Sequence, residues 1–270
     1  MFDGGREGAG VNVQREGGDG TVGKALDVLD RVAGFGRPVR FSEVLQDSPF
    51  PKATTYRLLQ TLVSQGMLRL DAETGTYAPG LRLVRMAHAA WAASSLAPIA
   101  RPHLDRLSAA VGETVHLAQL DGAHVLYVDK RRAAAPVPMF SDAGKIGPAY
   151  CTGVGKAMLA FLDGAALDRV LAQQSWHPFT QATITEPDAM RAELARVRAA
   201  GHALDREEHE PGIRCVAMPV LSGAGRVQGA VSVTTAGGAA VERHLPALAR
   251  AVDDITRDLR DWRFPDRRGG

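Results

Sequence analysis

Residues 22–78 contain three helical patterns followed by a hairpin pattern, and few folds have this order of elements. Apolar residues recur at helical spacing in Val22–Ala33 and in Pro51–Gln65, which predicts two amphipathic helices. Between them, Glu43–Gln46 is predicted as a short helix with Ser42 as its cap. Met67–Ala78 has two short strand patterns around a glycine turn. This order predicts a winged helix-turn-helix domain at residues 21–80.

The helix that begins at Pro51 starts with small polar and basic side chains. Hydroxyls and amides can bond phosphates and base edges, and Lys and Arg can neutralise phosphates or bond guanine. We therefore expect DNA contacts from Arg40, Lys52, Thr54, Thr55, Tyr56, Arg57, Gln60 and Arg69. The apolar side of the helix is predicted to be Ala53, Tyr56, Leu59, Leu62 and Val63. A solvated polar helix face is the alternative interpretation.

The net charge of the 270-residue chain is only +2, which does not identify a nucleic-acid binder. Divided along the chain, the charge is −2 in residues 1–20, +3 in residues 21–95 and +1 in residues 96–270. The small positive excess thus lies in the predicted helix-turn-helix domain, where it permits DNA binding without establishing it.

The remainder of the chain predicts a second domain of the α+β class. Residues 81–96 are alanine-rich and are expected to form a linker helix, followed by a domain at residues 97–262. Two strand patterns flank the turn Asp121-Gly122, and two more, Arg214–Leu221 and Arg226–Thr235, form a second hairpin. Hairpins imply antiparallel pairing, so a doubly wound parallel sheet is excluded.

Composition narrows the class of protein further. Seven glycines and few apolar residues predict a disordered tail at residues 1–20, and residues 263–270 are expected to form another. The sequence contains neither a run of about 18 apolar residues nor a secretory signal. Cys151 and Cys215 lie far apart, which excludes a disulfide framework and a four-cysteine zinc site. We expect a cytoplasmic protein with no membrane partner, no metal and no cofactor.

Three further motifs contain candidate chemistry. The string Gly153–Lys156 suggests a phosphate-binding loop, but Tyr150 and Ala157 occupy positions where that motif needs Gly and Ser or Thr. The acidic run Asp205–Cys215 suggests metal or acid–base chemistry, with a polar loop as the alternative. Ser232 and Thr234 alternate with valines, so both hydroxyls lie on one face of a strand, where they could bind a small polar ligand.

Two other functions stay open at this point. One is an enzyme with Cys151 as its nucleophile and His177 or His209 as the base. The other is a ligand-binding module that does not bind DNA.

The chain resembles the IclR family of bacterial transcriptional regulators over residues 21–259. Four strings carry the resemblance through their order and spacing: PKATTYRLLQTLVSQGML, CTGVGKAMLA, REEHEPGIRCVAMPV and GAVSV. The resemblance implies a winged helix-turn-helix domain, a linker helix and a GAF-like domain that binds an effector and mediates oligomerisation. It also implies operator DNA, a homodimer or a dimer of dimers, and a small carboxylic acid as the effector, without catalytic residues.

The resemblance also implies which residues would bind the effector. They are the backbone of Gly153 and Val154, together with Asp205, Cys215, Ser232 and Thr234. A carboxylate beside an anion is unfavourable unless it is protonated or bonded to a ligand hydroxyl, so a hydroxylated or keto acid is expected. The chain departs from the family pattern in two places. The turn Asp47–Phe50 lacks the usual glycine, and Thr234 replaces a second serine.

Overall fold

The computed structural model describes residues 20–93, 96–135, 138–237 and 240–261. They form two compact units, and the chain passes from one to the other between Ala93 and Ser94. Apart from Gly20, the tails predicted at residues 1–20 and 263–270 lie outside the described residues.

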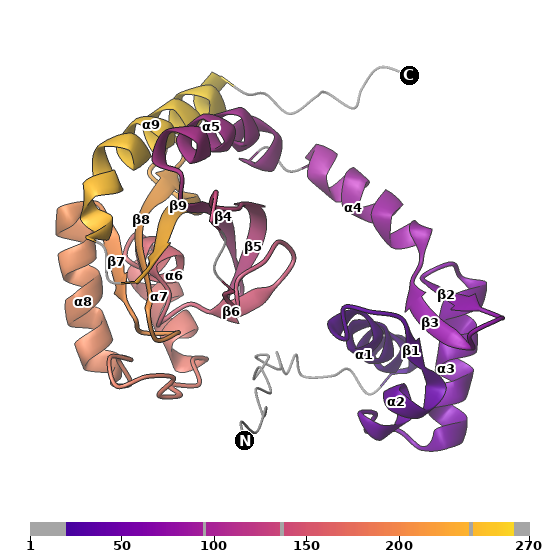
Figure 1. Cartoon of the computed structure of the whole chain (residues 1–270). Coiled ribbons are helices and arrows are strands. Elements are labelled where there is room, and N and C mark those ends of the chain that lie inside the picture. Colours follow the sequence, from indigo (N-terminus) through magenta and orange to yellow (C-terminus); the bar gives the residue numbers. More distant parts are fainter. Residues whose placement is uncertain (1–19, 94–95, 136–137, 238–239, 262–270) are drawn as a thin grey trace, which may run out of the picture. The chain divides into compact units, whose positions relative to one another are not determined.

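The N-terminal unit consists of helices around a small antiparallel sheet with the strand order β1-β3-β2 (Figure 1). Its elements are α1 (Thr21–Gly34), β1 (Val39–Arg40), α2 (Phe41–Gln46), α3 (Lys52–Ser64), β2 (Leu68–Asp71), β3 (Thr76–Pro79) and α4 (Leu81–Ala93). Apolar side chains of α1, α2, α3 and the sheet form one core, in which Val32 and Leu59 are fully buried. The predicted winged helix-turn-helix order is confirmed.

One local prediction in this unit was wrong, and another was wrong in part. Ser42 does not cap α2 but lies inside it, because the helix begins at Phe41, where the Glu43 carboxylate accepts a hydrogen bond of 2.8 Å from the backbone N–H of Arg40. The apolar side of α3 was predicted correctly in part. Leu59 and Leu62 are buried and Val63 packs against the core as predicted, whereas Ala53 and Tyr56 are exposed.

The C-terminal unit contains a six-stranded antiparallel sheet with the order β6-β5-β4-β9-β8-β7, which confirms the α+β class. The strands are β4 (Thr114–Asp121), β5 (His124–Arg131), β6 (Ile146–Pro148), β7 (Ala203–Arg206), β8 (Ile213–Leu221) and β9 (Val227–Ala236). Both predicted hairpins are present, as β4–β5 and β8–β9. Strands β4 and β9 pair at the centre although they are far apart in the sequence.

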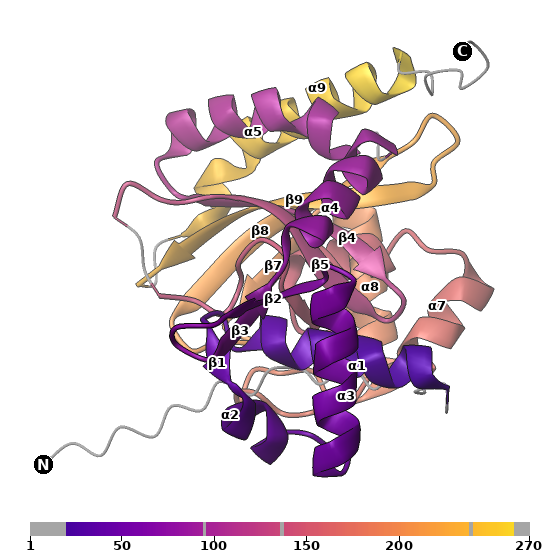
Figure 2. The same cartoon turned by 90° about the vertical axis from the view of Figure 1, so that its right-hand side faces the viewer.

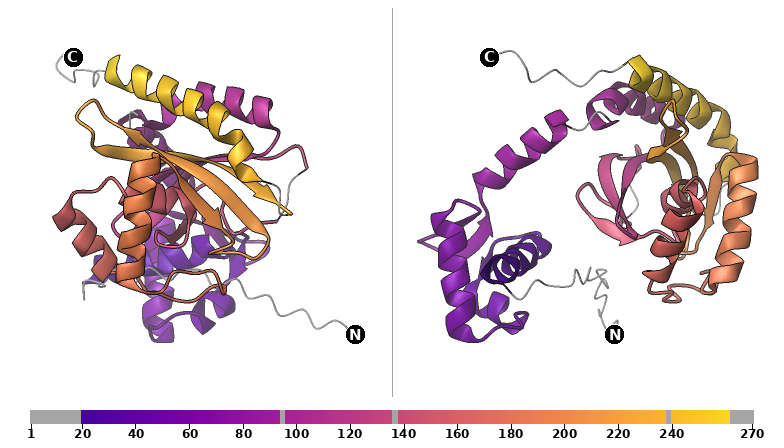
Figure 3. Two further views of the ribbon diagram at one scale, coloured as in Figure 1. Left: turned by 90° about the vertical axis from the view of Figure 1, so that its left-hand side faces the viewer. Right: turned by 180° about the vertical axis from the view of Figure 1, so that it is seen from behind.

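Helices cover the two faces of this sheet (Figures 2 and 3). They are α5 (Leu96–Val111), α6 (Gly153–Leu159), α7 (Gly164–Ala172), α8 (Pro187–Ala200), the 3-10 turn η1 (Val241–His244) and α9 (Leu245–Asp261). Helices α5 and α9 lie side by side and share one core with β4, β8 and β9. Helices α6, α7 and α8 pack in the second core, on the opposite face. No helix within the described ranges is long and apolar enough to cross a lipid bilayer.

Candidate functional site

Helix α3 has a basic and polar exposed face. The side chains of Lys52 and Arg57 are exposed and form no ion pair with any described residue. Tyr56 is 53% exposed, and the edge of its ring packs on Phe41 with centroids 5.7 Å apart. Gln60 is half-buried and donates a hydrogen bond of 3.4 Å to the hydroxyl of Tyr77. This face can meet an anionic surface through cations, an aromatic ring and an amide.

Thr55 was predicted to contact DNA, but its side chain is completely buried. Its hydroxyl lies 2.9 Å from the hydroxyl of Ser48 and donates a hydrogen bond of 3.2 Å to the carbonyl of Phe50. The backbone N–H of Phe50 in turn donates to the Ser48 hydroxyl. Thr55 therefore closes the glycine-free turn before α3, and the assignment of Thr55 as a DNA contact is corrected.

The other predicted DNA contacts lie at the surface to different extents. Thr54 is partly exposed at the start of α3. Arg40 is exposed in front of α2, and Arg69 is exposed on β2 in the predicted wing. All three side chains are thus accessible to a partner of the N-terminal unit.

One cavity of the C-terminal unit brings together all six residues that the family resemblance assigns to the effector. The six are Gly153, Val154, Asp205, Cys215, Ser232 and Thr234. Eight more residues line it: His116, Tyr127, Phe140, Ser141, Thr152, His209, Glu210 and Ile213. The cavity volume is about 30 Å³, the space of one or two water molecules, so a larger occupant requires side chains to move.

The strand register explains why these side chains meet. Asp205 on β7 lies opposite Cys215 on β8, and Cys215 lies opposite Thr234 on β9. Ser232 lies opposite His116 on β4. The His116 ring bridges the Ser141 hydroxyl at 2.9 Å and the Thr234 hydroxyl at 3.3 Å. Sequence reasoning missed His116 because no local pattern reveals which strand pairs with β9.

Gly153 allows helix α6 to approach the sheet closely. A Cβ atom at this position would lie 2.3 Å from the Sγ atom of Cys215, far inside van der Waals contact. The hydroxyl of Thr152 caps the helix by accepting a hydrogen bond of 3.3 Å from the N–H of Gly155. A larger residue at position 153 would force the Cys215 side chain or helix α6 to shift at the cavity wall.

The cavity is polar but has no cation among its described lining residues. Burial, and then the neighbouring Glu208 carboxylate, raise the pKa of Asp205 to about 7. Burial raises the pKa of the Cys215 thiol far above its ordinary value, so the thiol stays protonated. Burial also lowers the pKa of His116 to about 3, which keeps the imidazole neutral. Such a site offers neutral hydrogen-bonding groups and one carboxyl that can be protonated.

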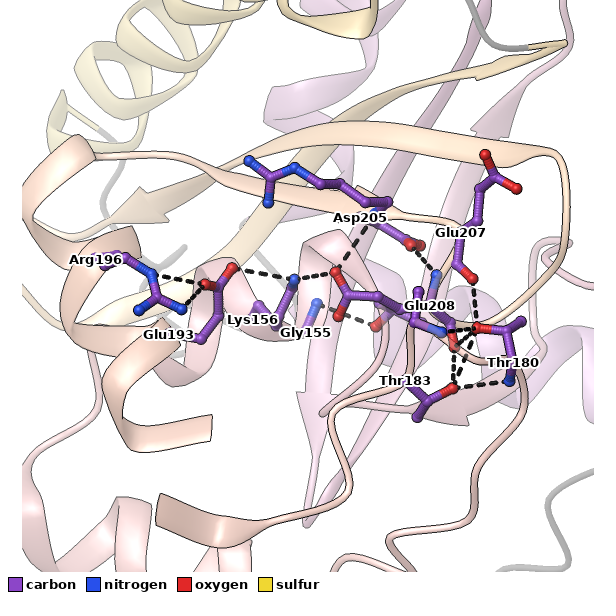
Figure 4. Close-up of polar contacts among 12 residues, drawn as sticks. Gly155, Lys156, Thr180, Thr183, Glu193, Arg196, Asp205, Glu207 and Glu208 are labelled. Atoms are coloured by element: carbon purple, nitrogen blue, oxygen red, sulfur yellow. Dashed lines mark hydrogen bonds and ion pairs between the residues drawn. The ribbon is translucent and has the colours of Figure 1, made fainter. Parts of the chain in front are cut away.

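A buried ion-pair network lies next to Asp205 (Figure 4). Lys156 on α6 has no exposed surface, and its Nζ lies 2.5 Å from Glu208 and 3.3 Å from Glu193. Arg196 pairs with Glu193 at 2.7 Å, while the second carboxylate oxygen of Glu208 has no hydrogen-bond partner among the described residues. The backbone N–H of Glu208 donates to Asp205 at 2.8 Å, which connects the network to the cavity.

The geometry does not support the hypothesis of a cysteine nucleophile. Cys151 is completely buried, and burial raises the pKa of its thiol far above the ordinary value. No hydrogen bond joins its sulfur to His177 or His209 among the described residues; these rings pack instead on Phe179. A nucleophile needs a base within hydrogen-bond reach and an accessible sulfur.

A winged helix-turn-helix unit and a second unit with a polar cavity define a transcriptional regulator with a ligand-binding domain. The chain belongs to the IclR family of bacterial transcriptional regulators. The C-terminal domain of that family matches residues 88–260, and its helix-turn-helix domain matches residues 21–72. The protein is therefore a DNA-binding transcriptional regulator with an effector-binding C-terminal domain, and its family is not one of enzymes.

The chain is similar in sequence to known regulators and in structure to solved members of the family. The transcriptional regulator BhcR of Paracoccus denitrificans is 32% identical over 250 residues, 93% of this chain and 89% of BhcR. The Thermotoga maritima IclR structure has a TM-score of 0.71 and 29% identity, covering 88% of this chain and 98% of that one. An IclR homologue from Microbacterium hydrocarbonoxydans, complexed with 4-hydroxybenzoate, has a TM-score of 0.81 and 25% identity, covering 90% of this chain and 100% of that one.

Proposed function

We propose that the exposed face of α3 reads an operator in the major groove of DNA. Lys52 and Arg57 neutralise phosphates or bond guanine, while Tyr56 and Gln60 reach base edges or sugars. Thr54, Arg40 and the wing residue Arg69 add contacts to the backbone. The observation that carries this proposal is that α3 of a winged helix-turn-helix unit exposes two cations, Lys52 and Arg57, which form no ion pair with a described residue.

The proposed effector is a small organic acid that carries a hydroxyl or keto group. It binds in the cavity against the backbone of Gly153 and Val154 and the side chains of Asp205, Cys215, Ser232 and Thr234. Three observations support this: the six residues line one cavity, the pKa of Asp205 is raised to about 7, and the Microbacterium relative holds a hydroxylated acid. Asp205 accepts a hydrogen bond from the ligand hydroxyl, or donates one when protonated.

The proposed assembly is a homodimer or a dimer of dimers. The N-terminal unit exposes large apolar side chains on two helices, with Val22 74% exposed on α1 and Leu81 84% exposed on α4. Val84, at 53%, and Met86, at 52%, add to the apolar surface of α4. An interface with a second copy of the chain would cover these side chains. A dimer would present two α3 helices to a palindromic operator.

A mobility-shift titration with the DNA flanking the protein's own gene tests the DNA-binding proposal. Arg57→Ala should weaken binding by roughly 5- to 150-fold, since a base or phosphate contact is worth about 1–3 kcal/mol. Arg226→Ala removes the same charge from an exposed position in the C-terminal unit and should bind as the wild type does. Equal losses in the two variants, or no loss in Arg57→Ala, would contradict the proposed role of α3.

A further inference from the structure

The hydroxyl of Tyr127 is a polar group of the cavity wall that the protein itself leaves without a hydrogen bond in the described chain. Tyr127 lies on β5, is only 6% exposed and lines the cavity. Its hydroxyl forms no hydrogen bond with any residue in the described part of the chain. Tyr150, another buried tyrosine, instead donates a hydrogen bond of 2.7 Å to the carbonyl of His177. A hydroxyl that no described protein group satisfies takes its partner from the cavity, either a water molecule or a ligand.

The groups around Tyr127 cannot easily become that partner. The ring of Tyr127 packs against His116 with centroids 5.3 Å apart. Both nitrogens of His116 already face the hydroxyls of Ser141 and Thr234. Burial, followed by the proximity of Cys215 and other acidic groups, raises the pKa of Tyr127 well above its ordinary value. Tyr127 therefore remains a neutral O–H group that can donate a hydrogen bond.

An acid in this cavity needs donors of this kind. The described lining contains the carboxyl groups of Asp205 and Glu210 but no Lys or Arg. Both oxygens of Glu210 accept from the backbone N–H of Phe140, and one oxygen of Asp205 accepts from that of Glu208. Ser232, which is 2% exposed, is a second lining residue whose hydroxyl forms no hydrogen bond within the described chain. Neutral donors must therefore replace a cation in binding the acid.

We infer that Tyr127, together with Ser232, donates a hydrogen bond to an oxygen atom of the acid effector and is a specificity-determining residue of the cavity. This inference rests on the proposed effector site and adds a residue on β5 to it. The substitution Tyr127→Phe removes the donor and keeps the ring that packs on His116. A hydrogen bond to a charged group is worth enough that its loss weakens binding roughly tenfold.

The experiment measures thermal unfolding and calorimetric binding of the full chain with lactate, pyruvate and 4-hydroxybenzoate as probes. Tyr127→Phe should unfold at the wild-type temperature without a probe, because its hydroxyl bonds no atom of the described residues. Its affinity for the acid that binds the wild type should be roughly tenfold lower. The matched control is Tyr150→Phe, which loses a hydrogen bond within the protein. It should unfold at a lower temperature and keep the wild-type affinity.

The possible results distinguish a failure of the proposed role of Tyr127 from a failure of the proposed effector site. If the wild type binds an acid and Tyr127→Phe binds it equally well, the role of Tyr127 is refuted while the effector site stands. If Tyr127→Phe loses as much thermal stability as Tyr150→Phe, the hydroxyl is structural and the inference fails. If none of the three acids binds the wild type, the proposed effector class fails and the inference fails with it.

Discussion

Replacing Lys156 by Met should destabilise the C-terminal unit strongly. The substitution keeps most of the side-chain volume but leaves two buried carboxylates without their shared cation (Figure 4). Breaking a buried ion pair by removing one partner costs about 3–5 kcal/mol. Most of this loss should come from Glu208, because Glu193 keeps its ion pair with Arg196. The free energy of unfolding, measured in urea by circular dichroism at pH 7, gives the loss directly.

Double variants show which of the two carboxylates causes the loss of stability in Lys156→Met. Lys156→Met with Glu208→Gln should be more stable than Lys156→Met alone, because no buried charge is left beside the missing ammonium. The same variant with Glu193→Gln should recover less. Burial already raises the pKa of Glu208, so Lys156→Met should also regain stability as the pH falls and this carboxyl takes up a proton.

The control is Lys145→Met, at an exposed lysine whose ammonium lies 5.0 Å from the centre of the Phe140 ring. It should change the free energy of unfolding by less than about 1 kcal/mol. A loss of less than about 1 kcal/mol in Lys156→Met, a value typical of a surface pair, would refute the reasoning. Equal recovery by the two Gln substitutions would refute the assignment to Glu208.

Three further predictions concern the cavity and the turn before α3. Gly153→Ala should cost about 1–3 kcal/mol, because its Cβ would lie 2.3 Å from the sulfur of Cys215; adding Cys215→Ala should restore part of the loss in urea unfolding, and no recovery would contradict the packing argument. The pKa of Asp205 is raised from 3.8 to about 7 in the folded protein. The protonated carboxyl therefore makes its full contribution to the free energy of unfolding below pH 3.8, and this contribution is lost as the pH rises through 7. Between pH 4 and 7 the wild type should therefore lose roughly 4 kcal/mol more than Asp205→Asn, and parallel pH profiles would exclude this. Thr55→Val should reduce the free energy of unfolding of the N-terminal unit by about 1–2 kcal/mol and so lower its melting temperature. At temperatures where this unit is still folded, the variant should bind the operator with wild-type affinity. A loss of operator affinity without a loss of stability would show that Thr55 does contact DNA.

The helical spacing of apolar residues predicted the helices of the N-terminal unit well. The wrong assignment of Thr55 as a DNA contact shows what such a pattern does not reveal. Thr55 has a hydroxyl at the start of a helix, which is a typical pattern for a DNA contact. Its burial depends on Ser48 and Phe50, whose hydrogen-bonding groups make a buried hydroxyl acceptable. Polarity alone does not distinguish a hydroxyl that faces DNA from one that closes a turn.

In the C-terminal unit, the sequence alone could not predict contacts between residues that lie far apart in the chain. Strand alternation predicted that Ser232 and Thr234 share a face, and the structure places both in the cavity. The contact between Thr234 and His116 spans 118 residues, and no local pattern encodes it. Lys156 was considered only as part of a rejected phosphate-binding loop, because its partners Glu193 and Glu208 lie 37 and 52 residues away. Tyr127 likewise gave no signal as a residue of an ordinary strand.

We propose, as the link between the two units, that an acid bound in the cavity changes the affinity of α3 for the operator. The most direct measurement titrates a fluorescent operator with the protein at saturating acid and without it, and titrates the acid with and without operator. Coupling between two sites is reciprocal, so both titrations should change by the same factor, typically about 5- to 150-fold. An acid that binds in the cavity and leaves the operator affinity unchanged would contradict the claim.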